Sequence, residues 1–299
     1  MRVDPGIALL LLTLTAFSVA AASHTWSGAG GNANWSTPAN WSSGGAPTMG
    51  ETNVALTFPA SPASYVSNND VTGLSVSGIT VSDNGYGISG APMTLTGNIT
   101  FDAPAPSSSA FDVPVSLGAS TSGGDYWVTV PAAGSSLNVG GTVSGFGTLT
   151  KAGLGKLSLS GANTYVGSTT ISAGTLNIGS ATALGATGTG TTVSSGAALT
   201  IQSGTAGIGV SEPLTLNGSG IGGTGALRAL DGDNSWSGSI TLNTADVTIA
   251  SPLSAHLALF GTLQGPGGLT TAGGPSTSDL RITGSGSNTY AGPTTIGTS

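Results

Sequence analysis

The chain has 299 residues, of which 51 are glycine and only 6% are charged, whereas an ordinary soluble domain carries roughly 25% charged residues. So few charges exclude a helical domain, because each surface helix needs a charged or polar face. The net charge is −7 without any basic run, which argues against nucleic-acid binding, and Cys is absent, so disulfides and thiolate metal sites are excluded.

Residues 1–22 have the pattern of a secretory signal peptide. Arg2 gives a weakly positive start, residues 7–19 are apolar, and residues 20–22 are three alanines that suit cleavage. The apolar stretch is too short for a permanent membrane span. We therefore expect a mature chain that begins near Ser23; the alternative is a retained N-terminal anchor.

Residues 23–60 form a tryptophan-rich segment, because three of the five tryptophans lie here: Trp26, Trp35 and Trp41. An open end of a stacked β-structure exposes its core, so we expect these rings to cap the first coil. The alternative is that they are exposed and stack on sugar rings, which would make the segment a glycan-binding site.

Short segments in which apolar and polar residues alternate dominate the rest of the chain. Alternation with period 2 is the pattern of strands with one buried and one solvated face. Clusters of Gly, Asn, Asp and Pro such as residues 82–85 and 265–268 separate them and supply turns. The sequence thus predicts an all-β protein with short strands, the clearest being residues 74–77, 79–82, 94–96, 156–160, 175–178 and 240–243.

Internal repetition favours a solenoid over a sandwich or barrel. The pattern Gly-x-Gly-x-Leu, followed after a variable stretch by Asn-x-aromatic-x-Gly-x-x-Thr-apolar, occurs three times. Stacked coils tolerate variable loops between fixed units, because the insertions project outward. At roughly 20 residues per coil, the mature chain would form about 13 coils. The copies are residues 145–149 with 163–171, 223–227 with 234–242, and 265–269 with 288–296.

Each residue of the repeated pattern has an expected role. The asparagine should occupy a tight turn and bond along the stack, the aromatic ring should cover the turn, and the glycine should permit a sharp corner. The final apolar residue should enter the next strand and point inward. These positions are Asn163, Tyr165 and Gly167 in the first copy, Asn234, Trp236 and Gly238 in the second, and Asn288, Tyr290 and Gly292 in the third.

Residues 146–185 closely resemble the autotransporter-associated β-strand repeat of Gram-negative passenger regions, and residues 25–48 are similar to the start of many such exported proteins. The resemblance implies a single-stranded right-handed parallel β-helix over residues 61–299, preceded by the signal peptide. It also implies secretion to the surface or outside of a Gram-negative bacterium, with a role for the repeat in crossing the outer membrane. The implied partner is the outer-membrane translocation machinery or a barrel domain missing from this chain.

The copies at residues 223–242 and 265–299 match this repeat only in part. The former has Trp236 in place of Tyr, and the latter has Thr271 where the first copy has Lys151. The last copy stops at Ser299, inside the pattern, so we expect the chain to be truncated or a fragment, which puts self-translocation in doubt.

Other candidate sites have little support. The compact charged cluster of Arg228, Asp231, Asp233 and Asn234 is expected to be a solvated turn; a calcium site or a carboxylate pair for polysaccharide cleavage are the alternatives. No metal ligation is expected of the isolated His24 and His256. The Gly-x-Gly-x-x-Gly match at residues 218–223 is attributed to the high glycine content, and no cofactor is expected. Lys151 and Lys156 are expected on solvated faces or edges.

These observations predict a non-enzymatic exported β-helix of the passenger type, which assists secretion and forms a surface scaffold. Two alternatives stay open. One is an adhesin or glycan-binding module that contacts surface glycans or the surfaces of host or neighbouring cells. The other is a β-helical polysaccharide lyase or hydrolase.

Overall fold

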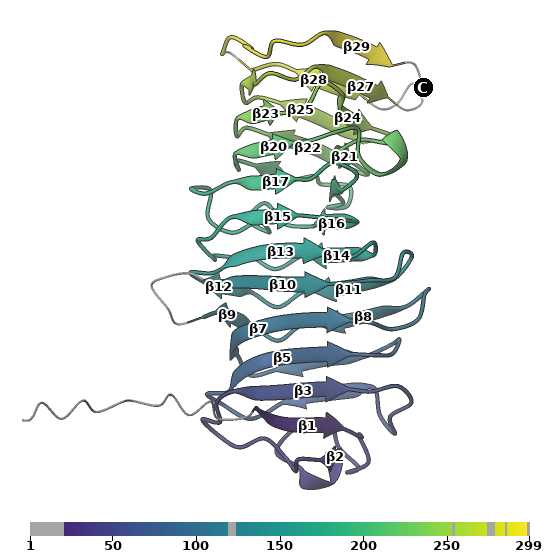
Figure 1. The fold of residues 1–299 in the computed structure, drawn as a ribbon, viewed down its shortest axis with the longest axis vertical. Coiled ribbons are helices and arrows are strands. Elements are labelled where there is room, and N and C mark those ends of the chain that lie inside the picture. The colour runs from purple at the N-terminus through teal and green to yellow at the C-terminus, as the bar shows by residue number, and fades with distance from the viewer. Residues whose placement is uncertain (1–20, 119–123, 253–254, 274–278, 285, 298–299) are drawn as a thin grey trace, which may run out of the picture.

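The computed structural model of the protein describes residues 21–118, 124–252, 255–273, 279–284 and 286–297. The predicted signal peptide lies almost entirely outside the described residues. The described chain is a parallel β-solenoid in which successive coils are stacked along one long axis, with β1 and β2 at one end and β27, β28 and β29 at the other (Figure 1). The prediction of an all-β solenoid is confirmed.

Sheet A is the 14-stranded sheet and runs along the whole stack. Except for the antiparallel pair β1–β2, its strands are parallel, and β7 is long enough to pair with both β9 and β10. In the order of the sheet, its strands are β2 (Trp41–Ser43), β1 (Ala22–Trp26), β3 (Val54–Phe58), β5 (Ser75–Val81), β7 (Met93–Phe101), β10 (Asp125–Thr129), β13 (Thr148–Ala152), β15 (Thr169–Ile171), β17 (Thr191–Val193), β20 (Leu214–Leu216), β23 (Ile240–Leu242) and β26 (Leu263–Gln264), with β9 (Val115–Leu117) and β12 (Val143–Gly145) beside them.

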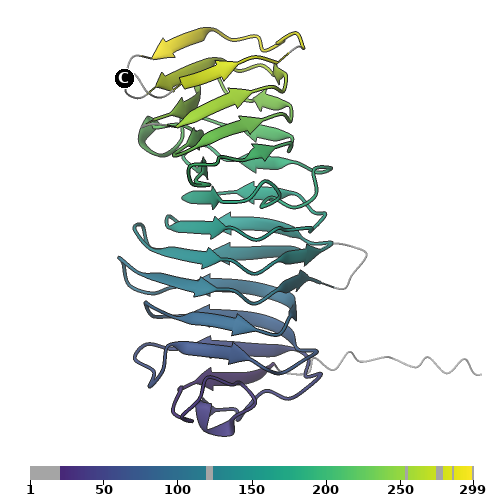
Figure 2. The ribbon, with the colours of Figure 1, turned by 180° about the vertical axis from the view of Figure 1, so that it is seen from behind.

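Sheet B is the 11-stranded sheet, and sheet C is a 4-stranded sheet near the C-terminal end of the stack (Figure 2). Sheet B comprises β4 (Val66–Asn69), β6 (Gly87–Gly90), β8 (Ser108–Phe111), β11 (Ser136–Val139), β14 (Lys156–Leu159), β16 (Thr175–Ile178), β18 (Ala198–Ile201), β21 (Leu227–Ala229), β24 (Val247–Ser251), β27 (Leu269–Gly273) and β29 (Thr294–Gly297). Sheet C comprises β19 (Gly209–Val210), β22 (Asp233–Trp236), β25 (His256–Leu259) and β28 (Asp279–Ile282). Two short 3₁₀ helices complete the described elements, η1 (Pro38–Asn40) and η2 (Ile221–Gly223).

The coils are fewer and longer than expected. Sheet B contributes one strand to each coil and has 11 strands in the described residues, compared with the roughly 13 coils expected. The register explains the difference. Leu137 pairs with Leu157, an offset of 20 residues, but Leu199 pairs with Leu227, an offset of 28. Loops inserted between the fixed strands therefore lengthen several coils without breaking the ladder.

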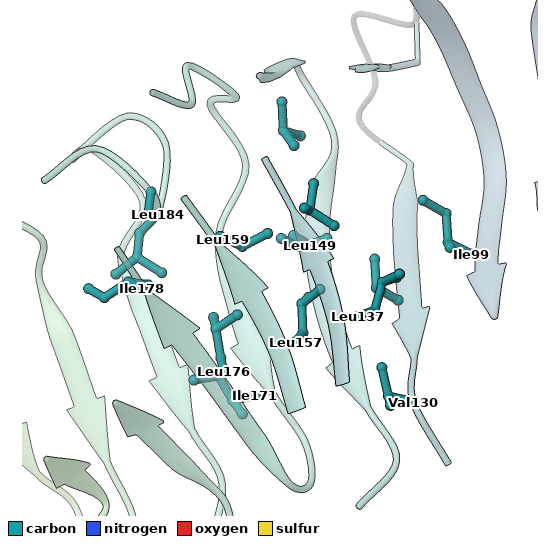
Figure 3. Packing of buried hydrophobic residues seen from close by; sticks show 14 of the residues in the cluster. Ile99, Val130, Leu137, Leu149, Leu157, Leu159, Ile171, Leu176, Ile178 and Leu184 are labelled. Carbon is teal, nitrogen blue, oxygen red and sulfur yellow. The ribbon is translucent and has the colours of Figure 1, made fainter. Parts of the chain in front are cut away.

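The interior is filled by columns of aliphatic side chains that follow from the alternating pattern. Leu137, Leu157 and Leu176 are register partners on β11, β14 and β16, and all three are buried. Figure 3 shows these leucines pointing into the same interior as Leu149 and Ile171 of sheet A. Burying a side chain of this size contributes about 1.5–3 kcal/mol, so each added coil extends the core that stabilises its neighbour.

A column of hydroxyl groups runs along the outer face of sheet A. Five threonines in successive strands are register partners, which gives one column along the stack: Thr150, Thr170, Thr192, Thr215 and Thr241. Their backbone groups pair with the strands above and below, so this solvated face needs few charged residues. Among the described residues, no helix has the length and apolar character needed to cross a membrane.

Candidate functional site

The repeated Asn-x-aromatic-x-Gly pattern is the candidate functional site, and we name its copies unit one (163–171), unit two (234–242) and unit three (288–296). In unit one, the N–H of Val143 in the preceding coil donates to Oδ1 of Asn163 at 2.8 Å. The N–H of Thr164 then donates to the Val143 carbonyl at 2.8 Å, and that of Val166 to the Gly145 carbonyl at 2.9 Å. These three hydrogen bonds join residues 163–166 of unit one to the coil before it.

Unit two makes the same three contacts. Ile208 N–H donates to Asn234 Oδ1 at 3.0 Å. Ser235 N–H donates to the Ile208 carbonyl at 2.9 Å, and Ser237 N–H donates to the Val210 carbonyl at 2.8 Å. Both units use the same three positions, which are the asparagine, the next residue and the residue three places after the asparagine. The pattern therefore encodes one hydrogen-bond geometry.

Unit three repeats this geometry against β26. Leu263 N–H donates to Asn288 Oδ1 at 2.9 Å. Thr289 and Ala291 donate to the carbonyls of Leu263 and Gly265, both at 2.9 Å. In all three units the asparagine accepts from an apolar residue, which is Val143, Ile208 or Leu263. The expectation that the asparagine bonds along the stack therefore matches the contacts of every copy.

The side-chain NH₂ groups of the unit asparagines have different hydrogen-bond acceptors. Nδ2 of the buried Asn163 donates to the carbonyl of Ala183 in the following coil at 2.7 Å, so this side chain links three consecutive coils. Nδ2 of Asn234 instead donates to the Asp231 carbonyl of its own turn at 2.5 Å. Asn288 is exposed. The asparagine of unit one thus bonds to the coils on both sides, whereas the amide group of Asn234 bonds within its own turn.

The aromatic residues are buried in units one and two. Tyr165 and Trp236 are both 0% exposed, whereas Tyr290 is partly buried. The hydroxyl of Tyr165 bonds to the Thr169 hydroxyl at 2.6 Å, and the hydroxyl of Tyr290 bonds to that of Thr294 at 2.5 Å. The Trp236 indole N–H donates to the Glu212 carbonyl at 2.8 Å. The polar atom of each aromatic side chain therefore makes a hydrogen bond, while its ring covers the turn.

The glycines are needed for a close approach and not for an unusual φ. None of Gly167, Gly238 and Gly292 has a positive φ. A Cβ on Gly167 would collide with the Gly147 carbonyl, and one on Gly238 would collide with the Glu212 carbonyl. This corrects the expected reason for the glycine, because the coil below leaves no room for a side chain.

The three units do not occupy the same side of the solenoid. Units one and two lead into β15 and β23, which belong to sheet A, but unit three leads into β29 of sheet B. The expected inward apolar residue is found in the first two, where Ile171 and Leu242 are 0% exposed. In unit three, Ile296 is in register with Thr271, on the side of the strand that the buried Leu269 occupies, but it is 73% exposed because β29 pairs only with β27 among the described strands.

The sequence predicts Lys151 on a solvated face or edge, and this prediction is wrong because the side chain is 0% exposed. It lies two residues after the buried Leu149 on β13 and so points to the same side of the strand. Its Nζ donates to the carbonyls of Ala152, Gly153 and Ala173 at 2.9, 2.8 and 3.2 Å. Burial lowers the pKa of Lys151 to about 8. Lys156 is partly exposed on β14.

Glu212 is a buried carboxyl group between units one and two that the sequence did not reveal. It is 2% exposed, its Oε1 accepts from the Thr191 hydroxyl at 3.3 Å, and Oε2 has no hydrogen-bond partner. Burial raises the pKa of Glu212 to about 7. Burial also raises the pKa of Tyr165, and the nearby Glu212 charge adds to this effect.

We expect Glu212→Gln to stabilise the protein at pH 7.5 and to leave its stability nearly unchanged at pH 4.5. The folded pKa of about 7 exceeds the ordinary value of 4.5, so the folded state binds more protons than the unfolded chain between these values. Stability is then lost as pH rises through this window, by at most about 3 kcal/mol. Urea midpoints measured from pH 4.5 to 8 check the change.

Glu51→Gln is the control for this prediction. Burial alone would raise the pKa of Glu51, but hydrogen bonds from Thr48 N–H and from His24 outweigh it and lower the pKa. That carboxylate contributes stability at neutral pH, so Glu51→Gln should destabilise the protein where Glu212→Gln stabilises it. A pH profile of Glu212→Gln parallel to that of the unaltered chain would contradict the assignment.

The three N-terminal tryptophans form a closed aromatic cluster. Trp26 and Trp35 are 0% exposed and Trp41 is 7% exposed. The Trp41 ring meets both of the others edge-on, with ring centroids 5.4 and 5.9 Å away, and Phe58 packs against all three. Each indole N–H has an acceptor, which is Ser64 O, Ser67 Oγ or Trp35 O. Stacking on a sugar would need an exposed ring face, which this packing does not offer.

The predicted charged cluster is divided by the fold. Arg228 lies on β21, in register with Thr200 and Ala250. Asp231 accepts the Ser203 N–H at 2.8 Å and forms part of a turn. Asp233 lies instead on β22, beside His256. Among the described residues, no group of three or more His, Cys, Asp or Glu side chains is arranged to hold a metal ion.

The remaining candidates have local structural roles. His24 is buried, and its ring nitrogens lie 3.1 Å from Glu51 Oε1 and 2.9 Å from the Gly45 carbonyl. In residues 218–223, Gly218, Gly220, Gly222 and Gly223 all have positive φ, and the helix η2 has only three residues. This segment is a turn and lacks the long helix that a dinucleotide site requires.

Comparison with known proteins agrees with this geometry. The passenger-associated-transport-repeat family model matches residues 149–178 and 278–298, which contain all of units one and three. The relative named "Adhesin BmaC autotransporter", from Brucella suis biovar 1 (strain 1330), is 33% identical over 206 residues. This match covers 60% of the chain and 6% of that relative, so the chain spans a small part of the relative's length. No solved structure matches.

The chain is thus a β-solenoid that carries a repeat found by the passenger-associated-transport-repeat model. The predicted resemblance is confirmed: the chain contains the passenger-associated transport repeat. Unit two lies outside the matched residues, yet it makes its inter-coil hydrogen bonds from the same positions of the pattern as units one and three. The geometry therefore identifies a third copy of the unit.

Proposed function

We propose that the chain is a non-enzymatic exported passenger whose repeat units lock successive coils and thereby assist folding and secretion at the bacterial outer membrane. The observation that carries this proposal is the same set of three inter-coil hydrogen bonds in each unit. A coil that forms outside the membrane adds these bonds and buried apolar surface to the preceding coil. Sliding back would break them, so folding favours outward movement.

The passenger-repeat match supports this role, and we propose that the chain acts with a partner at the outer membrane. We propose that this partner is an outer-membrane translocation apparatus or a barrel domain, and that the mature chain begins after the predicted signal peptide. The proposed destination is the cell surface or the medium of a Gram-negative bacterium. The relative's designation as an autotransporter supports the same destination.

The test is the rate at which the chain becomes accessible to external protease after a pulse of synthesis in a Gram-negative host. Asn163→Ala removes bonds to Val143 and Ala183 and leaves two backbone groups without partners, which costs about 2–4 kcal/mol. We expect surface appearance to slow several-fold. Asn243→Ala is the control, because it removes only an exposed side-chain bond to Asn217. Equal rates for the unaltered chain, Asn163→Ala and Asn243→Ala would refute the proposed role.

Adhesion is a second proposed function, supported by the word "adhesin" in the relative's name. The tryptophan cluster does not support it, because its rings are buried. A surface that presents both polar groups and an exposed aromatic ring exists instead on sheet C.

A further inference from the structure

The outer face of sheet C brings together charged residues that are far apart in the sequence. Asp233, His256 and Asp279 are register partners on β22, β25 and β28. Ser235, Ala258 and Arg281 form the neighbouring row of the same three strands. Since the rows are built from different coils, the cluster exists only when the solenoid is folded.

His256 lies between the two carboxylates. Its Nε2 is 3.8 Å from Asp233 Oδ1, and its Nδ1 is 3.6 Å from Asp279 Oδ1. Arg281 donates through Nε to Asp279 Oδ2 at 2.7 Å. His256 Nδ1 and Asp279 Oδ1 have no hydrogen-bond partner. These two atoms are buried and face each other, so the polar groups that stay open to a ligand are those of the exposed Asp233 and Arg281 side chains.

These side chains line a groove of about 390 Å³, together with Asn234 and Phe260. A groove of this volume is within the range of small-molecule sites. Phe260 is 52% exposed, so part of its ring is open to solvent at the end of β25. The groove thus combines an apolar ring with acceptors and donors at its side.

Structural stabilisation does not explain the concentration of charge. The side chains of Asp233, His256 and Arg281 are 80%, 42% and 66% exposed, and ion pairs between groups so exposed contribute little to stability. Only 6% of the whole chain is charged, and the outer threonine column of sheet A shows that a solvated face here needs no charge. A role in binding accounts for both the charges and the exposed ring.

We propose that this groove binds an uncharged saccharide, an inference that rests on the proposed adhesive function. Carboxylates accept hydrogen bonds from sugar hydroxyls, the imidazole and guanidinium groups donate to them, and the Phe260 ring contacts the apolar face of a pyranose. Among the residues that line the groove, Asp233 and Asp279 are two carboxylates and Arg281 is the one guanidinium group. That balance disfavours an acidic saccharide.

The test is binding of the full chain to an array that presents neutral and sialylated or sulfated oligosaccharides. We expect the unaltered protein to bind neutral glycans. Phe260→Ala and Asp233→Asn should each reduce this binding at least tenfold. Phe146→Ala is the matched control, because Phe146 is 56% exposed but lies between β12 and β13, away from the groove. Its binding should equal that of the unaltered chain, and urea midpoints should show that all variants fold.

The outcomes separate the groove from the adhesive function. Neutral-glycan binding that survives both groove substitutions would overturn the groove and leave adhesion in place. A preference for acidic glycans, or equal loss in Phe146→Ala, would also overturn it. An unaltered chain that binds no glycan would overturn the groove and glycan adhesion together, while the secretion assay reports on the repeat units independently.

Discussion

Gly167→Ala should destabilise the protein by about 3 kcal/mol, although alanine is smaller than every other chiral residue. The backbone at Gly167 has an ordinary φ, so conformational strain is not the cause. The added methyl group would collide with the Gly147 carbonyl of the coil below. The two coils must separate to accept it, which weakens the neighbouring Val166–Gly145 hydrogen bond. The urea midpoint measures the loss.

Gly188→Ala is the matched control for this prediction. Gly188 also has an ordinary φ, and a Cβ built on it has no neighbour within 4 Å. The substitution should be neutral or slightly stabilising, because alanine restricts the unfolded chain. If Gly167→Ala and Gly188→Ala had the same midpoint, close stacking at the unit glycine would be refuted.

Trp35→Ala should cost about 3–5 kcal/mol, which is the usual penalty for truncating a buried tryptophan. The ring is 0% exposed, packs 5.9 Å from both Trp41 and Phe58, and donates its indole N–H to Ser67. Its loss leaves a cavity in the first coils and the Ser67 hydroxyl without its donor. Faster amide exchange in β1 and β3 would localise the effect.

Trp127→Ala tests whether any tryptophan would give this result. Trp127 is 43% exposed on β10, so its removal should cost much less than that of Trp35. Equal losses would contradict the closed cluster. A Trp35→Ala protein that kept its midpoint would show that the aromatic cluster does not stabilise the first coils.

Local pattern predicted much of the fold. All six alternating segments lie in or overlap strands, and segments 74–77 and 79–82 both overlap β5, where a register shift between Val76 and Gly78 lets one strand include both. The number of coils was overestimated, because alternation within a strand carries no information on the length of the loops between strands. The β-helix was expected to begin at residue 61, but β1 and β3, within residues 22–58, already belong to sheet A of the stack.

The candidate site was predicted in part. The asparagine ladder follows from the repeat, but its glycine depends on a carbonyl 20 residues earlier for Gly167 and 26 residues earlier for Gly238, and only the register brings the two together. Lys151 could have been assigned to the interior, because it shares the parity of Leu149 on one strand. Asp233, His256 and Asp279 are spaced by 23 residues, a distance that becomes meaningful only once the local coil length is known.

The position of unit three on a different side from units one and two has an evolutionary consequence. Because the unit makes its bonds with the backbone directly beneath it, it operates wherever a neighbouring coil presents an apolar residue in the right register. A gene duplication or deletion then need not preserve a whole number of coils to yield a working copy. Such chains can change in length and cross-section while every inherited copy of the unit keeps its hydrogen bonds to the neighbouring coil.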